Sequence, residues 1–193
     1  MDFSSYIMKW KEENVEVIYS AAPSPYVQEL VRQLVRYGFW PKMIFAQMTF
    51  FLEDLAGIGN TLGDGICSPF FWTKEYPDPS RELAETYMRA FNKYYVPDLG
   101  VSYSGLQVIK DALERAGSLD RDAINKAFSE TDLMTVEGRV KFDQKTHVSK
   151  WPTVVIQWRA YGSYGWTIEV VYSPYPYIKT TAPFLFPLPP PRK

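Results

Sequence analysis

Few side chains in this chain of 193 residues could carry out chemistry. His147 is the only histidine, and we expect it in an exposed turn rather than beside a serine in a G-x-S-x-G elbow. Cys67 is the only cysteine, so no internal disulfide can form, and one cysteine with one histidine cannot assemble a zinc site of the usual spacing. We therefore expect no enzyme, no metal site and no cofactor.

A glycine-rich segment, G-I-G-N-T-L-G-D-G at residues 57–65, could be compared with a phosphate-binding loop. It lacks the G-K-[ST] ending and precedes an expected strand rather than a helix, so we interpret it as an ordinary loop. The carboxylate pairs Glu12 and Glu13, and Glu53 and Asp54, lie beside lysines or helix ends, where solvated charges are common. None of these features requires catalysis.

The composition is that of a globular chain, with 46% hydrophobic and 22% charged residues. A net charge of −1 and the lack of a basic stripe disfavour nucleic-acid binding. The sequence contains no apolar span of 18 residues, and its first residues, M-D-F-S-S-Y-I-M-K-W-K, do not resemble a signal peptide. Aromatic residues make up 17%, which fits either a stacking pocket or aromatic cores.

The first third of the chain alternates helices with short strands, which favours a parallel sheet in an α/β fold. We expect helices from Ser4 or Ser5 to Trp10 and from Tyr26 to Leu34, and strands at 15–19, 43–46 and 63–71.

The sequence pattern in the middle of the chain predicts helices after Asp78 or Ser80, at 105–116 and at 120–128. With no strand between them, their apolar faces must contact each other, another chain or another lobe. A hairpin containing F-D-x-x-T-H and the strand T-V-V-I-Q-W follow. The proline-rich tail from Ser173 should be extended, packing Phe184 and Phe186 against the body as a strap rather than serving as a ligand for an aromatic groove.

Four motifs occur in order across residues 2–172: D-F-S-S-Y-I, V-R-Q-L-V-R-Y-G, Y-S-G-L-Q-V-I-K-D-A-L-E-R-A-G, and S-E-T-D-L-M-T-V-E-G-R-V-K-F-D-Q-K-T-H followed by T-V-V-I-Q-W. Each is weak alone. Together they resemble the C-terminal portion of the periplasmic solute-binding proteins of branched-chain amino acid type ABC transporters, which are Leu/Ile/Val-binding-like type I periplasmic binding proteins.

The resemblance implies an α/β second lobe, a parallel sheet with flanking helices, together with an incomplete helical part of the first lobe. Residues 1–71 and 150–172 would form the ligand-binding lobe. Residues 72–149 would be the helical remnant of lobe one with the hinge crossings, and 173–193 the Pro-rich tail. The resemblance also implies a periplasmic or extracytoplasmic location, a small-molecule solute and a membrane permease as partner, although the chain as written carries no signal peptide.

Ligand contacts in that family come from loops at the carboxyl ends of the strands. By position, the resemblance implies the following contacts: Pro23, Ser24, Gln47, Phe71, Trp72 and Tyr103. Members that bind α-amino acids usually place a carboxylate where this chain has Gln47, and the tyrosine expected in the first loop is replaced by Pro23 or Ser24. Since a neutral amide offsets a buried ammonium poorly, we expect an amide, an aromatic carboxylate or another small organic solute. The alternative is that Gln47 only caps its loop and that the aromatic residues are core.

Three functional interpretations follow. The first is a truncated substrate-binding component of an ABC uptake transporter for an amino acid or other small organic solute. The second is a stand-alone ligand-sensing or interaction module that forms a homodimer through exposed helices at 79–130. The third, a small hydrolase on the same scaffold, lacks a nucleophile and base. We favour the first.

Overall fold

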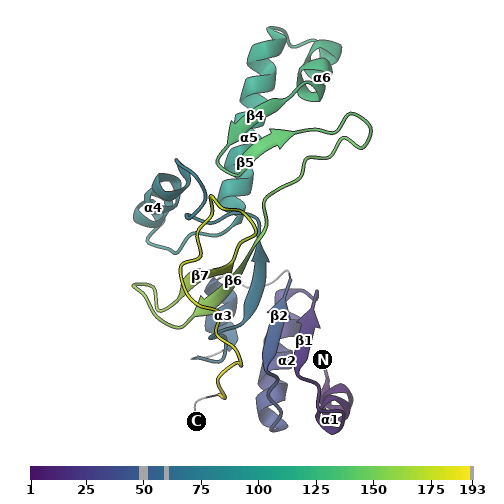
Figure 1. The fold of residues 1–193 in the computed structure, drawn as a ribbon, viewed down its shortest axis with the longest axis vertical. Coiled ribbons are helices and arrows are strands. Elements are labelled where there is room, and N and C mark those ends of the chain that lie inside the picture. The colour runs from purple at the N-terminus through teal and green to yellow at the C-terminus, as the bar shows by residue number, and fades with distance from the viewer. Residues whose placement is uncertain (48–51, 59–60, 192–193) are drawn as a thin grey trace. The chain divides into compact units, whose positions relative to one another are not determined.

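The computed structural model describes residues 1–47, 52–58 and 61–191, which form two compact units (Figure 1). Unit 1 contains Met1–Pro69, Val155–Ser173 and Thr180–Lys193, and unit 2 contains Phe70–Val154 and Pro174–Lys179. The helices and strands are α1 (Ser4–Glu12), β1 (Val17–Ser20), α2 (Ser24–Arg36), β2 (Met43–Ala46), α3 (Leu52–Ile58), β3 (Cys67–Phe70), α4 (Ser80–Phe91), α5 (Asp98–Ala116), α6 (Arg121–Ser129), β4 (Asp132–Thr135), β5 (Gly138–Lys141), β6 (Val154–Arg159) and β7 (Thr167–Tyr172). Among the described residues, no helix has the length and apolar character needed to cross a membrane.

The sheet of unit 1 has five strands in the order β1-β2-β3-β6-β7. β1 and β2 are parallel, in a register that runs from Val17 opposite Met43 to Ser20 opposite Ala46, and β3 is parallel to β2. β6 and β7 form an antiparallel pair. The predicted α/β fold with a parallel-rich sheet is confirmed, but β7, which was not predicted, makes the sheet mixed.

α2 buries one stripe of its surface in unit 1. Val27, Leu30, Val31 and Leu34 are buried, at the three- and four-residue spacing of a helix face. In a β1-α2-β2 connection this stripe packs against the sheet, where Ile44 of β2 is also buried. The local sequence pattern and the tertiary core therefore agree in this part of the chain.

α5 of unit 2 starts earlier than the sequence pattern predicts. It begins at Asp98 rather than at residue 105, and it ends as predicted at Gly117, whose φ of 59° is left-handed. α6 follows Asp120, whose side chain accepts hydrogen bonds from the backbone of Asp122 at 3.1 Å and Ala123 at 3.0 Å. α4 differs, since neither Asp78 nor Ser80 caps it with a side-chain hydrogen bond.

Trp72 belongs to unit 2 and is fully buried. Its Nε1 donates to the hydroxyl of Ser80 at 3.1 Å, and that hydroxyl donates to the carbonyl of Val136 at 2.9 Å. Its ring also crosses α5 so closely that a Cβ at Gly100 would lie 2.1 Å from ring atoms. Glycine at position 100 is therefore what permits this packing.

The sequence predicted that the apolar faces of these helices contact each other, another chain or another lobe, but unit 2 also contains a small two-stranded sheet. β4 and β5 form an antiparallel hairpin, and α5 packs against both β4 and α6. The hairpin and α6 do not bury all of α5, because Leu106, Ile109 and Leu113 stay exposed. An apolar stripe of α5 therefore remains at the surface of unit 2.

The described part of the proline-rich tail contains no helix or strand, and its anchors are not the predicted phenylalanines. Phe184 and Phe186 stack on each other and stay exposed, whereas Leu188 is buried in unit 1. The backbone N–H of Leu188 donates to the carbonyl of Lys42 at 2.8 Å. The buried amide of Gln157 also holds the tail, bonding both the N–H and the carbonyl of Leu185.

Candidate ligand-binding site

The carboxyl ends of β1 and β2 lie level in unit 1, because the register pairs Ser20 with Ala46. Beyond the strands, the N–H of Gln47 donates to the carbonyl of Ser20 at 2.8 Å. From β3, the buried hydroxyl of Ser68 donates to the carbonyl of Ala46 at 2.7 Å. This edge of an open α/β sheet is the usual position for a ligand. The predicted loop that starts at Gln47 continues into residues 48–51, which lie outside the described residues.

Gln47 is exposed at this edge and is oriented by two aromatic neighbours. Its Oε1 accepts a hydrogen bond from the hydroxyl of Tyr19. The ring of Tyr19 stacks on that of Phe45 in the neighbouring strand, with centroids 5.8 Å apart and planes at 20°. The N–H2 of Gln47 donates to no described residue. It can therefore donate to a carbonyl or carboxylate oxygen of a ligand.

The loop between β1 and α2 supplies the other predicted contacts of unit 1. The hydroxyl of Ser20 accepts from the backbone of Ala22 at 3.3 Å, and Pro23 immediately precedes the first turn of α2. Ser24 starts the helix, and its hydroxyl accepts from Gln28 at 3.4 Å. α2 begins without a side-chain cap, so the positive end of its dipole favours a negative or neutral polar group at this edge.

The three predicted contacts in unit 2 differ in exposure. Phe71 is 39% exposed and packs edge-to-face on Trp151, with ring centroids 5.5 Å apart. Tyr103 is exposed on α5. Trp72 has no exposed surface, and its indole N–H is already bonded within unit 2. Of the predicted residues, Pro23, Ser24 and Gln47 lie together in unit 1, while Trp72 is placed in a core.

Two residues at this edge, Tyr19 and Phe45, were not predicted as ligand contacts. Both precede the last residue of their strands and pair across the β1–β2 ladder. A signal was present in the sequence, because an aromatic residue one place before each strand end puts both rings on one face of a parallel pair.

The model of the periplasmic binding protein family matches residues 1–163. Leu/Ile/Val-binding protein homolog 2 of Brucella abortus (strain 2308) is 28% identical over 163 residues, covering 82% of this chain and 42% of the relative. Leu/Ile/Val-binding protein homolog 1 of the same organism is 30% identical over 149 residues, covering 75% of this chain and 38% of the relative. This chain therefore spans less than half the length of these curated relatives.

Solved structures show the same fold. The leucine binding protein of Thermotoga maritima MSB8 superposes with a TM-score of 0.74 at 24% identity, covering 90% of this chain and 49% of that protein. At that identity the match is evidence for the fold alone. This chain again corresponds to less than half of the protein that it matches.

Proposed function

This chain belongs to the periplasmic binding protein family, of the branched-chain amino acid type, and on that premise we propose that it acts in solute binding for an ABC uptake transporter. In this role it binds a small solute outside the cytoplasmic membrane and delivers it to a membrane permease, without chemistry. Residues 1–71 and 150–172 serve as a ligand-binding lobe, 72–149 as the helical part of the other lobe, and 173–193 as a tail.

The ligand contacts in this proposal come from the carboxyl-end edge of unit 1. The observation that carries it is the hydrogen bond from Tyr19 to Gln47, which orients a neutral amide beside two stacked rings. Pro23 and Ser24 in the loop before α2 and the exposed Phe71 and Tyr103 of unit 2 are further candidate contacts. Trp72 then acts from the core, by fixing the segment that carries Phe71.

The proposed solute is an amide, an aromatic carboxylate or another small organic molecule, rather than an α-amino acid. An ammonium ion taken out of water needs an opposite charge, and neither Gln47 nor the Pro23–Ser24 loop carries one. A solute carbonyl or carboxylate instead accepts from the amide of Gln47, and an aromatic ring stacks on Tyr19.

The test measures thermal unfolding of the chain with leucine, benzamide and benzoate, since a ligand that binds only the folded state raises the midpoint. We expect benzamide or benzoate, and not leucine, to raise it. Gln47→Glu should reverse the preference and strengthen leucine binding about tenfold, equivalent to ~1.4 kcal/mol. Asn125→Asp, which makes the same charge change on α6, is the matched control and should alter neither. Tight leucine binding by the unaltered chain would show that the assigned solute class is wrong.

A second candidate function is a stand-alone ligand-sensing or interaction module that forms a homodimer. The exposed stripe of Leu106, Ile109 and Leu113 on α5 favours it, because apolar patches of this kind mark association sites. Sedimentation equilibrium of the chain and of Leu106→Glu separates the two functions. A dimer that the variant dissociates supports the module, and a monomer in both supports the transport role.

A further inference from the structure

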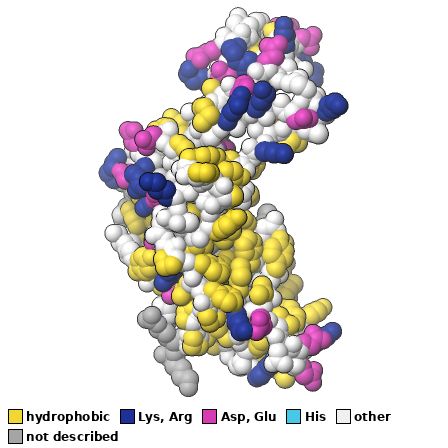
Figure 2. Space-filling model, in the orientation of Figure 1, with side chains coloured by type: hydrophobic (Ala, Val, Ile, Leu, Met, Phe, Trp, Pro, Cys, Tyr) yellow, Lys and Arg dark blue, Asp and Glu magenta, His cyan; other side chains and the backbone are white. Residues whose placement is uncertain are grey.

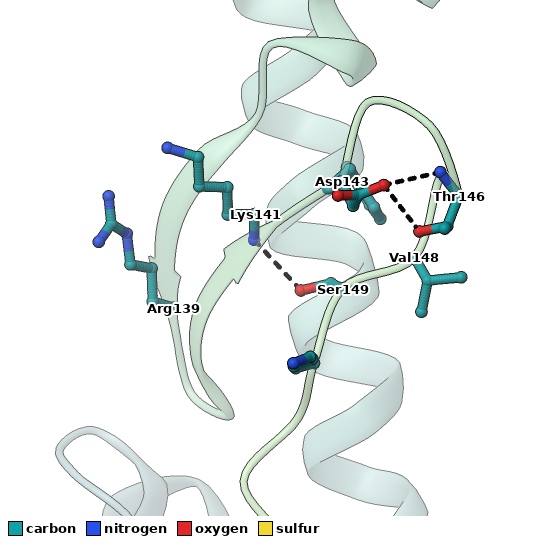
Figure 3. Close-up of a pocket in the computed structure, with 8 residues that line it drawn as sticks. Arg139, Lys141, Asp143, Thr146, Val148 and Ser149 are labelled. Atoms are coloured by element: carbon teal, nitrogen blue, oxygen red, sulfur yellow. Dashed lines mark hydrogen bonds between the residues drawn. The ribbon is translucent and has the colours of Figure 1, made fainter.

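Two neighbouring hollows of unit 2 adjoin the segment that follows β5. The larger, of about 600 Å³, is lined by charged residues including Arg139, Lys141 and Asp143 (Figure 3). Arg139 and Lys141 extend from β5 on the side away from the loop of Asp143. Both pair with Asp132, and Asp143 accepts from the backbone and hydroxyl of Thr146. Two of its cations, Arg139 and Lys141, are therefore already paired with a carboxylate, and we base no anion site on this hollow.

The second hollow, of about 370 Å³, is mostly apolar, a size typical of small-molecule sites. α5 contributes Val101, Gly105 and Val108 to its wall, and β5 contributes Val140. Trp151 forms part of the rim and is 48% exposed. All of these residues belong to unit 2.

Glu137 is the acidic residue in the wall of this hollow. It occupies the turn between β4 and β5, where its backbone N–H donates to the hydroxyl of Thr135 at 3.2 Å. Its side chain is buried, with the residue only 5% exposed, and its Oε1 has no hydrogen-bond partner. No lysine or arginine lines the hollow, and the ionisable groups beside Glu137 are the phenol of Tyr76 and the imidazole of His147. A cationic partner for the carboxyl is therefore missing from the wall.

A buried acidic oxygen without a partner is costly, and such groups are usually satisfied by an ion, a water or a ligand. Burial raises the pKa of the Glu137 carboxyl above its usual value, and the hydroxyl of Ser104 offsets part of this rise. A cation in the hollow would favour the ionised carboxylate and so oppose this rise. The indole of Trp151, held edge-to-face by Phe71, adds an aromatic face that attracts a cation.

We propose that this hollow binds a small organic ammonium ion, with its charged nitrogen on the Glu137 carboxylate and its apolar body against Val101, Val108 and Trp151. This site takes a cation, whereas the edge of unit 1 that contains Gln47 takes a neutral or anionic solute. The two assignments depend on different polar groups, Gln47 in unit 1 and Glu137 in unit 2, so either can fail without the other.

The test uses 2-phenylethylamine as the probe and 2-phenylethanol as its uncharged counterpart. Binding of each is measured by titration calorimetry and by the indole N–H signals of the tryptophans in NMR spectra. We expect saturable binding of the amine, with the Trp151 signal shifted, and no binding of the alcohol. Glu137→Gln should weaken amine binding at least tenfold. Glu130→Gln removes an exposed carboxylate of the same type and should leave binding unchanged.

Gly105→Leu provides a second test that does not alter the charge. A Cβ at Gly105 meets no atom within 4 Å, so a leucine can extend into the hollow without distorting α5. We expect this variant to fold with an unchanged or higher thermal midpoint and to lose amine binding. Equal binding of amine and alcohol, unaltered binding by Glu137→Gln, or full binding by folded Gly105→Leu would each overturn the proposal. Gln47→Ala should leave amine binding intact, which separates this site from the site in unit 1.

Discussion

Gln157 shows how a single buried amide connects segments that are distant in the sequence. Its Nε2 donates to the carbonyls of Gly65 at 2.8 Å and Leu185 at 2.9 Å, and its Oε1 accepts from the N–H of Leu185 at 2.7 Å. We expect Gln157→Leu to destabilise unit 1 by about 2–3 kcal/mol, because buried backbone groups lose their partners. Urea unfolding measures the loss. Gln144→Leu, at an exposed position, should cost less than about 0.5 kcal/mol, and equal effects of the two changes would contradict the role given to Gln157.

Glu137 makes stability depend on pH in a direction that its burial determines. Burial raises the pKa of its carboxyl in the folded state, so the folded chain binds more protons than the unfolded chain at pH values just above the usual pKa of glutamate. Stability should therefore fall as pH rises from about 4.5 through the raised pKa. The thermal midpoint of Glu137→Gln should depend less on pH across that window. Parallel curves for the two proteins would show that Glu137 does not titrate in this way.

Two glycines of helix α5 differ in the space that surrounds them. A Cβ at Gly100 would lie 2.1 Å from the Trp72 ring, whereas a Cβ at Gly105 would meet open space. Gly105→Ala should stabilise unit 2 by about 0.5–1 kcal/mol through helix propensity. Gly100→Ala should destabilise it by about 1–3 kcal/mol through overpacking. Urea unfolding of the two variants compares the same substitution within one helix, and equal effects would contradict the packing of Trp72 against α5.

Elements with a local signal could be predicted from the sequence. The helical stripe of α2 and the cap at Asp120 depend on neighbours a few residues away. β7 also carries such a signal, six residues rich in β-branched types, and was predictable. The early start of α5 was not, since Gly100 is needed there by Trp72, which is 28 positions earlier in the chain.

The candidate site likewise contains some residues whose positions could be predicted from the sequence and others whose positions could not. The position of Gln47 follows from the rule that parallel strands bring their carboxyl ends to one edge. The burial of Trp72 does not follow from any local pattern, because it depends on Ser80, Gly100 and the turn at Val136. Likewise, the sequence shows a glutamate at 137 but not that its Oε1 lacks a partner.

At the scale of the whole molecule, hydrophobic side chains gather over the part of the visible surface that belongs to unit 1, and charged side chains cluster on α6 and the β4–β5 hairpin (Figure 2). Each unit also has its own buried aromatic core, with Trp158 in unit 1 and Trp72 in unit 2. Because each unit has a core of its own, ligands of the two units should stabilise them separately.

Cys67 provides a way to measure that separation. It is the only cysteine, it lies fully buried in β3 of unit 1, and burial raises the pKa of its thiol to about 11, so labelling by a thiol reagent requires unit 1 to open. A saturating solute at the Gln47 edge should slow labelling in proportion to one plus the ratio of its concentration to its Kd. 2-Phenylethylamine, bound in unit 2, should leave the labelling rate unchanged while it raises the unfolding midpoint of unit 2. If the amine slowed labelling as much as the solute does, the two units would have to open together, and independent stabilisation would be wrong.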